Sequence, residues 1–300
     1  MRVGFIGLGR MGLPMCANLV RAGYDVTAGD LRPGRQDAVA ACGARWGGTA
    51  VEVAAAADVL ITVLPGTREL CDMMMPMPGG VLAALPRAAT WIDMTSTAPV
   101  AGRVLAHAAR AGGVGMLDAP AGGGVPAAIS GTLQLFVGGD AELFERHCGL
   151  LQALADPHRI VHMGGHGAGY TTKLLVNLLW FGQAIATAEA LLLAHREGID
   201  LEVLHRALAD SAAASSFIHH DLSALLGGDY LASFGLDRCT EELAAITDLA
   251  RENGVPFQLS EHVEQTYRCA LARYGPADGE LLAVAMLEEQ AGSQLRRRPA

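Results

Sequence analysis

The sequence predicts an α/β domain with a largely parallel, doubly wound sheet, followed by an all-α domain built on a long interdomain helix. Short apolar runs alternate with alanine-rich helical stretches through the first half. A glycine-rich turn follows the first run, and the strand-like runs stop before residue 165. We therefore expect one domain over residues 1–164 and a second over residues 165–300.

Seven strands are expected in the first domain, each a short apolar run: Arg2–Gly7, Asp25–Asp30, Val59–Leu64, Trp91–Met94, Met116–Asp118, Leu133–Val137 and Ile160–Met163. Alanine-rich segments with helical spacing lie between most of them: Met11–Ala22, Thr49–Ala57, Pro99–Ala111 and Ala141–Ala153. This alternation indicates βαβ units with helices on both faces of the sheet. The link from Asp118 to Leu133 is too short and glycine-rich for a long crossover helix, so the last strands are expected to include mixed directions.

The second half is entirely helical in pattern after Gly169. A long helix is expected over Tyr170–Arg196, about 40 Å at the standard helical rise. Its apolar part carries Asn177, Gln183 and Glu189, which favours a helix buried between protein surfaces over one that spans a membrane. Further helices are expected between glycine and proline breakers, at Leu201–Ala209, Ser216–Leu226, Glu241–Asn253, Ser260–Arg273 and Glu280–Glu289.

Composition narrows the classes of partner. A content of 51% hydrophobic and 18% charged residues is typical of a compact globular protein. The formal charge of −9 argues against nucleic acid, and the one basic stretch, Arg296–Arg298, is expected to be a solvated tail. Six scattered cysteines without zinc-ligand spacing predict no metal site and a reduced, cytoplasmic protein. Because the first residues already form a strand, no signal peptide is expected.

A Gly7-x-Gly9-x-x-Gly12 turn follows the first strand and opens the first helix. In this pattern Gly7 allows the tight turn, Gly9 lets the backbone approach a pyrophosphate, and Gly12 lets the helix pack on the strand. The phosphates then lie at the positive end of the helix dipole. The context of strand, turn and helix predicts a Rossmann-type dinucleotide-binding domain.

Asp30 ends the second expected strand, 18 residues after Gly12. A carboxylate at this position accepts hydrogen bonds from the adenosine ribose hydroxyls, and it would repel the 2′-phosphate of NADP. Leu31 offers no cation, whereas Arg32 lies close enough to leave NADP possible. NAD is therefore the preferred cofactor.

Consecutive glycines follow the strand that ends at Asp118, in the loop Gly122-Gly123-Gly124. Their backbone N–H groups can hold a carboxylate or an oxyanion. Ligands of open parallel sheets gather at the carboxyl ends of the strands, which places this loop near the cofactor.

Lys173 is the only lysine, because 21 of the 22 basic residues are arginine. A buried lysine can give up its proton near neutral pH and arginine cannot, so this position suggests a proton donor and acceptor. Lys173 and Asn177 are four residues apart on the long helix and share a face. We expect Asn177 to orient a substrate hydroxyl while Lys173 exchanges its proton. His162 and His166 lie nearby but are expected to fill turn or surface roles.

Together these motifs resemble the β-hydroxyacid dehydrogenase family along nearly the whole chain. The segment Asp93-Met94-Thr95-Ser96-Thr97-Ala98-Pro99 is similar to the family's Asp-x-Ser-Thr-x-x-Pro motif, and Leu64-Pro65 resembles the end of its third strand. The resemblance implies that Lys173 and Asn177 are catalytic and that they contact substrate together with Ser96, Gly122, Gly123 and Gly124. It implies a cofactor site made by Gly7, Leu8, Gly9, Arg10, Met11, Gly12, Asp30, Leu64, Pro65 and Ser96.

Five residues at four sites depart from the family pattern. Gly122 stands where a serine is usual, which removes a hydroxyl contact to the substrate carboxylate. Ala127 replaces a usual glycine, and Val176 stands where many members have an asparagine. Glu241-Glu242 occupy the place of a usual Lys-Asp pair, which removes positive charge near the site. The departures weigh against a standard small hydroxyacid such as 3-hydroxyisobutyrate, although not against the reaction type.

The resemblance implies an NAD(P)-dependent oxidoreductase that acts on a hydroxyacid or the corresponding aldehyde, as a homodimer or homotetramer joined through the helical domain. Two alternatives remain. One is an imine reductase of the same architecture, a class that usually carries aspartate or tyrosine where Lys173 stands. The other is a catalytically silent nucleotide-binding or dimerisation module, in which loss of the lysine would be expected.

Overall fold

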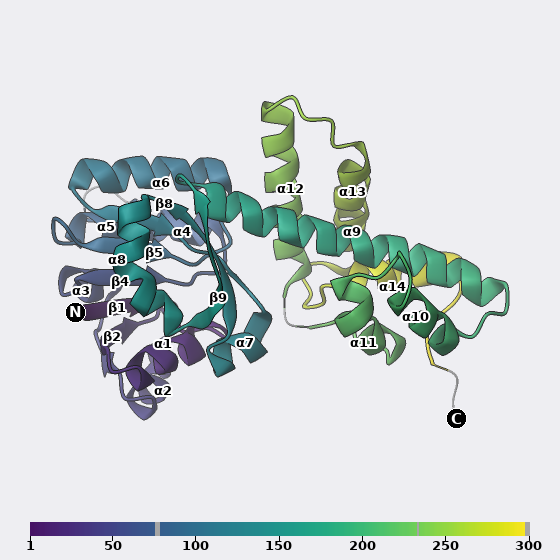
Figure 1. Ribbon diagram of the computed structural model, residues 1–300, viewed down its shortest axis with the longest axis horizontal. Helices are drawn as coiled ribbons and strands as arrows, with labels where there is room; N and C mark the ends of the chain where they lie inside the picture. The colour runs from purple at the N-terminus through teal and green to yellow at the C-terminus, as the bar shows by residue number, and fades with distance from the viewer. Residues whose placement is uncertain (76–78, 233, 298–300) are drawn as a thin grey trace. The chain divides into compact units, whose positions relative to one another are not determined.

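The computed structural model describes residues 1–75, 79–232 and 234–297. The chain forms two compact units, Met1–Lys173 and Leu174–Ala300, which are described separately. The predicted fold class, a mostly parallel α/β domain and then helices on a long helix, is confirmed (Figure 1). The predicted domain boundary after residue 164 remains a prediction.

The first unit contains one nine-stranded sheet, in the order β3-β2-β1-β4-β5-β6-β8-β7 with β9 paired to β8. All pairs from β3 to β6 are parallel, β8 is antiparallel to β6 and β7, and β9 is parallel to β8. The strands are β1 (Arg2–Ile6), β2 (Asp25–Gly29), β3 (Arg45–Trp46), β4 (Val59–Thr62), β5 (Thr90–Asp93), β6 (Gly115–Asp118), β7 (Ala121–Gly122), β8 (Leu133–Gly139) and β9 (Ala155–Gly164). The strand order reverses between β1 and β4, which is where ligands of such sheets bind.

Two buried clusters cover the two faces of this sheet. Side chains of α1 (Gly12–Arg21), α2 (Gln36–Ala41), α7 (Gly124–Ser130) and α8 (Ala141–Gln152) contribute to one cluster. The other contains side chains of α3 (Ala50–Ala55), α4 (Thr67–Met74), α5 (Val81–Ala84) and α6 (Pro99–Gly112). A parallel sheet needs both faces covered because its strands are apolar on both sides.

The second unit is helical, as expected. It contains most of α9 (Ala168–Arg196), then α10 (Leu201–Ala209), a π-helical turn over Phe217–Asp221, α11 (Leu222–Leu226), α12 (Leu236–Glu252), α13 (Gln258–Tyr274) and α14 (Leu282–Ala291). Phe181, Phe217 and Tyr267 are buried in its core, and the rings of Phe181 and Tyr267 lie 4.9 Å apart.

Helix α9 crosses the boundary between the two units and contributes to both cores. Tyr170 belongs to a cluster of the first unit, and Leu178 and Leu191 belong to that of the second. Among the described helices, α9 alone is long and apolar enough to cross a membrane, and 44% of its most apolar window is buried. Leu179 and Leu193 remain more than 60% exposed.

The expectation that Arg296–Arg298 form a solvated tail is corrected by the structure. Two of the three arginines form contacts with the helical unit. Arg296 donates to Glu288 at 2.9 Å and to the hydroxyl of Tyr230 at 2.6 Å. Arg297 forms an ion pair with Glu202 at 2.6 Å. The buried Glu288 carboxylate therefore holds Arg296 against the helical unit. Arg298 lies outside the described residues.

Candidate active site

The loop between β1 and α1 has the geometry of a phosphate-binding turn. A Cβ built on Gly7 would lie 2.1 Å from the carbonyl oxygen of Val63, and one on Gly12 would lie 1.8 Å from that of Gly7. No side chain fits at either position, and Gly7 also has a φ of +99°. A Cβ on Gly9 would meet nothing within 4 Å. The loop is therefore packed tightly against backbone at Gly7 and Gly12 and leaves open space at Gly9. This space would let a pyrophosphate lie against the backbone of Gly9.

Asp30 follows β2 and faces this loop. Its carboxylate accepts hydrogen bonds from the backbone N–H of Leu8 at 2.7 Å and from Arg32, whose Nε lies at 2.9 Å and Nη2 at 3.1 Å. Burial acts to raise the pKa of Asp30, but the hydrogen bonds from Arg32 and Leu8 outweigh it and lower the pKa to about 2. The carboxylate is charged at neutral pH and already has a guanidinium beside it.

A second carboxylate, Asp93, is wholly buried at the end of β5. Its Oδ1 accepts hydrogen bonds from the hydroxyls of Thr62 at 2.5 Å and Thr95 at 2.8 Å, and its Oδ2 accepts one from Tyr170 at 2.6 Å. The Thr95 hydroxyl in turn accepts from the backbone N–H of Leu64 at 3.1 Å. Burial raises the pKa of Asp93 to about 6, although these hydroxyls act to lower it.

Asp118, at the end of β6, accepts hydrogen bonds from the backbone at the start of α9. Its two carboxylate oxygens accept from the backbone N–H groups of Gly167 at 3.0 Å and Tyr170 at 3.2 Å. It thereby satisfies N–H groups that a helix start leaves without an intrahelical partner. A Cβ on Gly169 would lie 2.3 Å from the carbonyl oxygen of Phe136, so glycine is required where α9 meets the sheet. The backbone of α9 therefore approaches β8 closely at Gly169.

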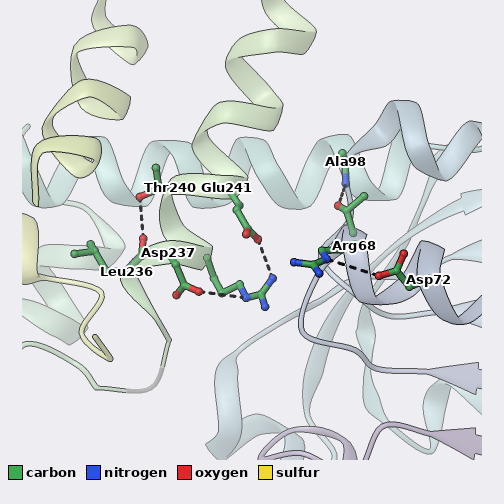
Figure 2. Close-up of polar contacts among 9 residues, drawn as sticks. Arg68, Asp72, Ala98, Leu236, Asp237, Thr240 and Glu241 are labelled. Carbon is green, nitrogen blue, oxygen red and sulfur yellow. Dashed lines mark hydrogen bonds and ion pairs between the residues drawn. The ribbon is translucent and has the colours of Figure 1, made fainter. Parts of the chain in front are cut away.

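Ser96 lies half-buried in the loop after β5, between the buried residues Thr95 and Thr97. The loop ends where the backbone N–H of Ala98 donates to the hydroxyl of Thr67 at 2.8 Å, at the start of α4 (Figure 2). Leu64 and Pro65 follow β4, and the hydrogen bond from Leu64 to Thr95 ties them to the same loop. These predicted cofactor contacts thus come from neighbouring strands at one edge of the sheet.

The glycine loop Gly122–Gly124 joins β7 to α7, a short helix that the sequence did not indicate. Gly123 and Gly124 have positive φ and are exposed. Gly122 pairs with Gln134 of β8, and a Cβ on Gly122 would meet only ordinary contacts, the nearest 3.6 Å away on Gln134. Packing therefore does not require glycine at position 122.

Lys173 and Asn177 lie on α9, as predicted, and both are half-buried. The Nδ2 of Asn177 donates to Glu242 of α12 at 2.5 Å. The adjacent Glu241 is exposed and forms an ion pair with Arg238 at 2.9 Å, and Arg238 also lies 3.8 Å from Asp237; Figure 2 labels both acids. An arginine thus supplies positive charge beside the acid that departs from the family pattern.

Three residues of the first unit, Asp93, Asp118 and Tyr170, and one of the second, Glu242, were not predicted as functional. The two aspartates had a visible signal, because a charged residue that closes an apolar strand must find partners when it is buried. Tyr170 had no such signal, and Glu242 was noted only as part of the Glu241-Glu242 departure from the family pattern. His166 lies with its Nδ1 4.0 Å from Asp118, and His162 contacts the carbonyl oxygen of Gly139. No cluster of three metal-ligating side chains occurs within the described ranges.

Comparison with known proteins places the chain among the dehydrogenases of this fold. Residues 2–165 match the family described as the NAD binding domain of 6-phosphogluconate dehydrogenase. Residues 167–287 match the family described as NAD-binding of NADP-dependent 3-hydroxyisobutyrate dehydrogenase. A 2-(hydroxymethyl)glutarate dehydrogenase of Eubacterium barkeri is 32% identical over 267 residues, which cover 89% of this chain and 88% of that protein.

Solved structures agree with this assignment. A 3-hydroxyisobutyrate dehydrogenase of Mycobacterium tuberculosis, solved with L-serine, has a TM-score of 0.83 at 30% identity and covers 95% of this chain and 98% of its own. An imine reductase from Pseudomonas sp. shares the fold alone, with a TM-score of 0.59 at 19% identity over 95% of this chain and 98% of its own. The chain therefore belongs to the β-hydroxyacid dehydrogenase family and is an NAD(P)-binding dehydrogenase that acts on hydroxyl groups.

Proposed function

We propose that this dehydrogenase transfers a hydride reversibly between a nicotinamide and a hydroxyacid, or the corresponding semialdehyde, with Lys173 as general acid and base. The observation that carries the proposal is the placement of the only lysine. It lies one turn beyond Tyr170, on a helix start that Asp93 and Asp118 hold against the sheet edge. Proton exchange needs an ionisable group held in a fixed position, and a lysine amine can be that group.

Lys173 accepts the proton of the alcohol during oxidation and returns it during reduction. Asn177 orients the hydroxyl. Its amide nitrogen carries two hydrogens and donates one to Glu242, so the other can donate to the substrate oxygen while the hydroxyl proton goes to Lys173. The nicotinamide, when bound, supplies or receives the hydride at its C4 carbon.

The acid end of the substrate is assigned to Ser96 and to the backbone N–H groups of Gly123 and Gly124. Gly122 contributes no side chain where relatives in the family usually have a serine. We therefore expect weaker binding of small hydroxyacids such as 3-hydroxyisobutyrate, and turnover of acids that make further contacts of their own.

NAD is the proposed cofactor, with Gly7, Leu8, Gly9, Arg10, Met11 and Gly12 around its pyrophosphate. Asp30 supports this choice because its carboxylate is charged and lies where a ribose hydroxyl would donate. Arg32 is the group that could instead meet the phosphate of NADP, once released from Asp30. Fluorescence titration with NADH and NADPH tests the choice, and equal affinities would contradict it.

The assembly is proposed to be a homodimer or homotetramer in the cytoplasm, joined through the helical unit. Leu175, Val176, Leu179 and Leu193 support it, because these apolar side chains of α9 are exposed within one chain. Light scattering after gel filtration measures the mass in solution, and a monomer at micromolar concentration would contradict the proposal.

The reaction is tested by following absorbance at 340 nm with both cofactors. The panel contains 3-hydroxyisobutyrate, L-serine and 2-(hydroxymethyl)glutarate, with cyclic imines as the alternative substrates. Lys173→Ala is expected to lower kcat by about a thousandfold or more while NADH binding is retained. Equal rates in the variant and the parent would remove Lys173 from the mechanism, and turnover of imines alone would favour an imine reductase.

A further inference from the structure

The wholly buried Asp93 connects three parts of the proposed site. Through Thr95 it reaches the backbone N–H of Leu64, in the segment that follows β4. Thr95 also directly precedes Ser96, assigned to cofactor and substrate. Through the hydroxyl of Tyr170 it reaches α9, one turn before Lys173. One carboxylate thus links the cofactor side, the Ser96 loop and the helix that carries the lysine.

The Tyr170 ring has little freedom to move from this bond. It is fully buried, and a Cβ on Gly102 of α6 would lie 2.3 Å from its Cε2 atom. The ring therefore lies directly on the backbone of α6. Its own backbone N–H donates to Asp118, so two aspartates from adjacent strands fix both the main chain and the side chain of one residue.

We propose that Asp93 and Tyr170 are positioning residues that fix the first turns of α9, and with them the Lys173 amine, relative to the ends of β4 and β5. The inference rests on the proposed role of Lys173. Neither residue needs to touch the substrate. A hydride and a proton that move between fixed partners require placement to within about an ångström, and this buried bond supplies it.

Tyr170→Phe removes the hydroxyl and keeps the ring against Gly102. A matched control exists in the second unit: Tyr267 is equally buried, and its hydroxyl donates to the carbonyl oxygen of Glu280 at 2.9 Å. Tyr267→Phe thus also deletes one hydrogen bond made by a buried tyrosine, although the bond itself is part-buried. An effect that comes from lost stability alone should appear in both Tyr170→Phe and Tyr267→Phe. An effect on the position of Lys173 should appear in Tyr170→Phe only.

The only lysine allows a measurement that does not need turnover. Reductive methylation with ¹³C-formaldehyde keeps the charge and labels Lys173 and the chain's α-amino group, whose resonances differ. The Lys173 resonance is expected to move and broaden in Tyr170→Phe and to stay as in the parent in Tyr267→Phe. A folded Tyr170→Phe with the parent's resonance would overturn the proposal.

Steady-state kinetics with NAD and the hydroxyacid of the panel that the parent turns over fastest supply the second measurement. Tyr170→Phe is expected to lower kcat by on the order of tenfold with KM nearly unchanged, because transition-state placement is lost and ground-state binding is kept. Should Tyr170→Phe not fold, Gly102→Ala displaces the same ring without altering Asp93, and the same two outcomes apply. Full activity of Lys173→Ala would contradict the proposed role of Lys173. The ¹³C resonance of Lys173 in Tyr170→Phe would still test whether Tyr170 positions α9.

Discussion

Two buried carboxylates, one in each unit, are satisfied in different ways. Glu288 of α14 accepts hydrogen bonds from Arg296, from Tyr230 and from the backbone N–H of Leu295. Asp93 accepts hydrogen bonds from the hydroxyls of Thr62, Thr95 and Tyr170. An ion pair offsets much of the cost of burying a charge, and hydroxyl groups offset less of it. The stability of the protein is therefore expected to respond differently when each of the two carboxylates is neutralised.

The largest effect on the free energy of unfolding is expected for substitution of Glu288, the carboxylate that is paired with Arg296. Glu288→Gln leaves Arg296 beside an uncharged group and should lower the free energy of unfolding by about 3 kcal/mol. Urea denaturation at pH 7 measures it. The control is Glu289→Gln, next in sequence, where the ion pair with Arg273 is exposed and the expected loss is below about 1 kcal/mol. Similar losses in both variants would remove the distinction.

The second prediction concerns the pH dependence of stability. Burial raises the pKa of Asp93 to about 6 from an ordinary value of 3.8, so the folded state holds this proton more tightly than the unfolded state. Its contribution is therefore fully present below about pH 4 and is lost as pH rises through 6, by about 3 kcal/mol at most. Asp93→Asn cannot titrate and should lose this slope. An unchanged slope between pH 4 and pH 7 would show that Asp93 is not its source.

The third prediction compares the tyrosines that donate to the two carboxylates. Tyr230→Phe should cost about 1 kcal/mol of stability, because Glu288 keeps Arg296 and the Leu295 N–H. It should not change kcat, whereas Tyr170→Phe should. Thermal unfolding and steady-state kinetics on both variants measure the difference, and a fall of kcat in Tyr230→Phe would contradict it.

The smallest effect on stability is expected at Gly122. Its φ is not positive and a Cβ meets only ordinary contacts. The free energy of unfolding of Gly122→Ser should therefore lie within about 0.5 kcal/mol of that of the parent. The added hydroxyl should lower KM for 3-hydroxyisobutyrate by roughly three- to tenfold, the value of one hydrogen bond. A KM that does not change would remove position 122 from carboxylate binding.

The sequence was sufficient where a local pattern carried the structure. The helix expected over Leu201–Ala209 was found with the same bounds, because its apolar spacing and its Asp200 cap are local. The strands β3 and β7, of two residues each, were missed because they are too short to show a period. Helices α2, α4, α5 and α7 were missed as well, being short and held mainly by packing.

The site divides in the same way. The glycine turn shows a local pattern, and two of its constraints are local too: the positive φ of Gly7 and the contact that a Cβ on Gly12 would make with the Gly7 carbonyl oxygen. The Asp93–Tyr170 bond joins residues 77 positions apart, and the Arg296–Glu288 pair depends on where the chain's end folds back. No period or motif in a single sequence encodes such pairings, so the tail was wrongly expected to be solvated.

The contact between Gly102 and the Tyr170 ring has a consequence for how this family diverges. At a helix position where any side chain would displace the ring above it, a substitution also affects the aromatic residue that occupies that space. We expect homologous chains with alanine or serine at the position of Gly102 to carry a smaller side chain at that of Tyr170, so that the two positions vary together across the lineage.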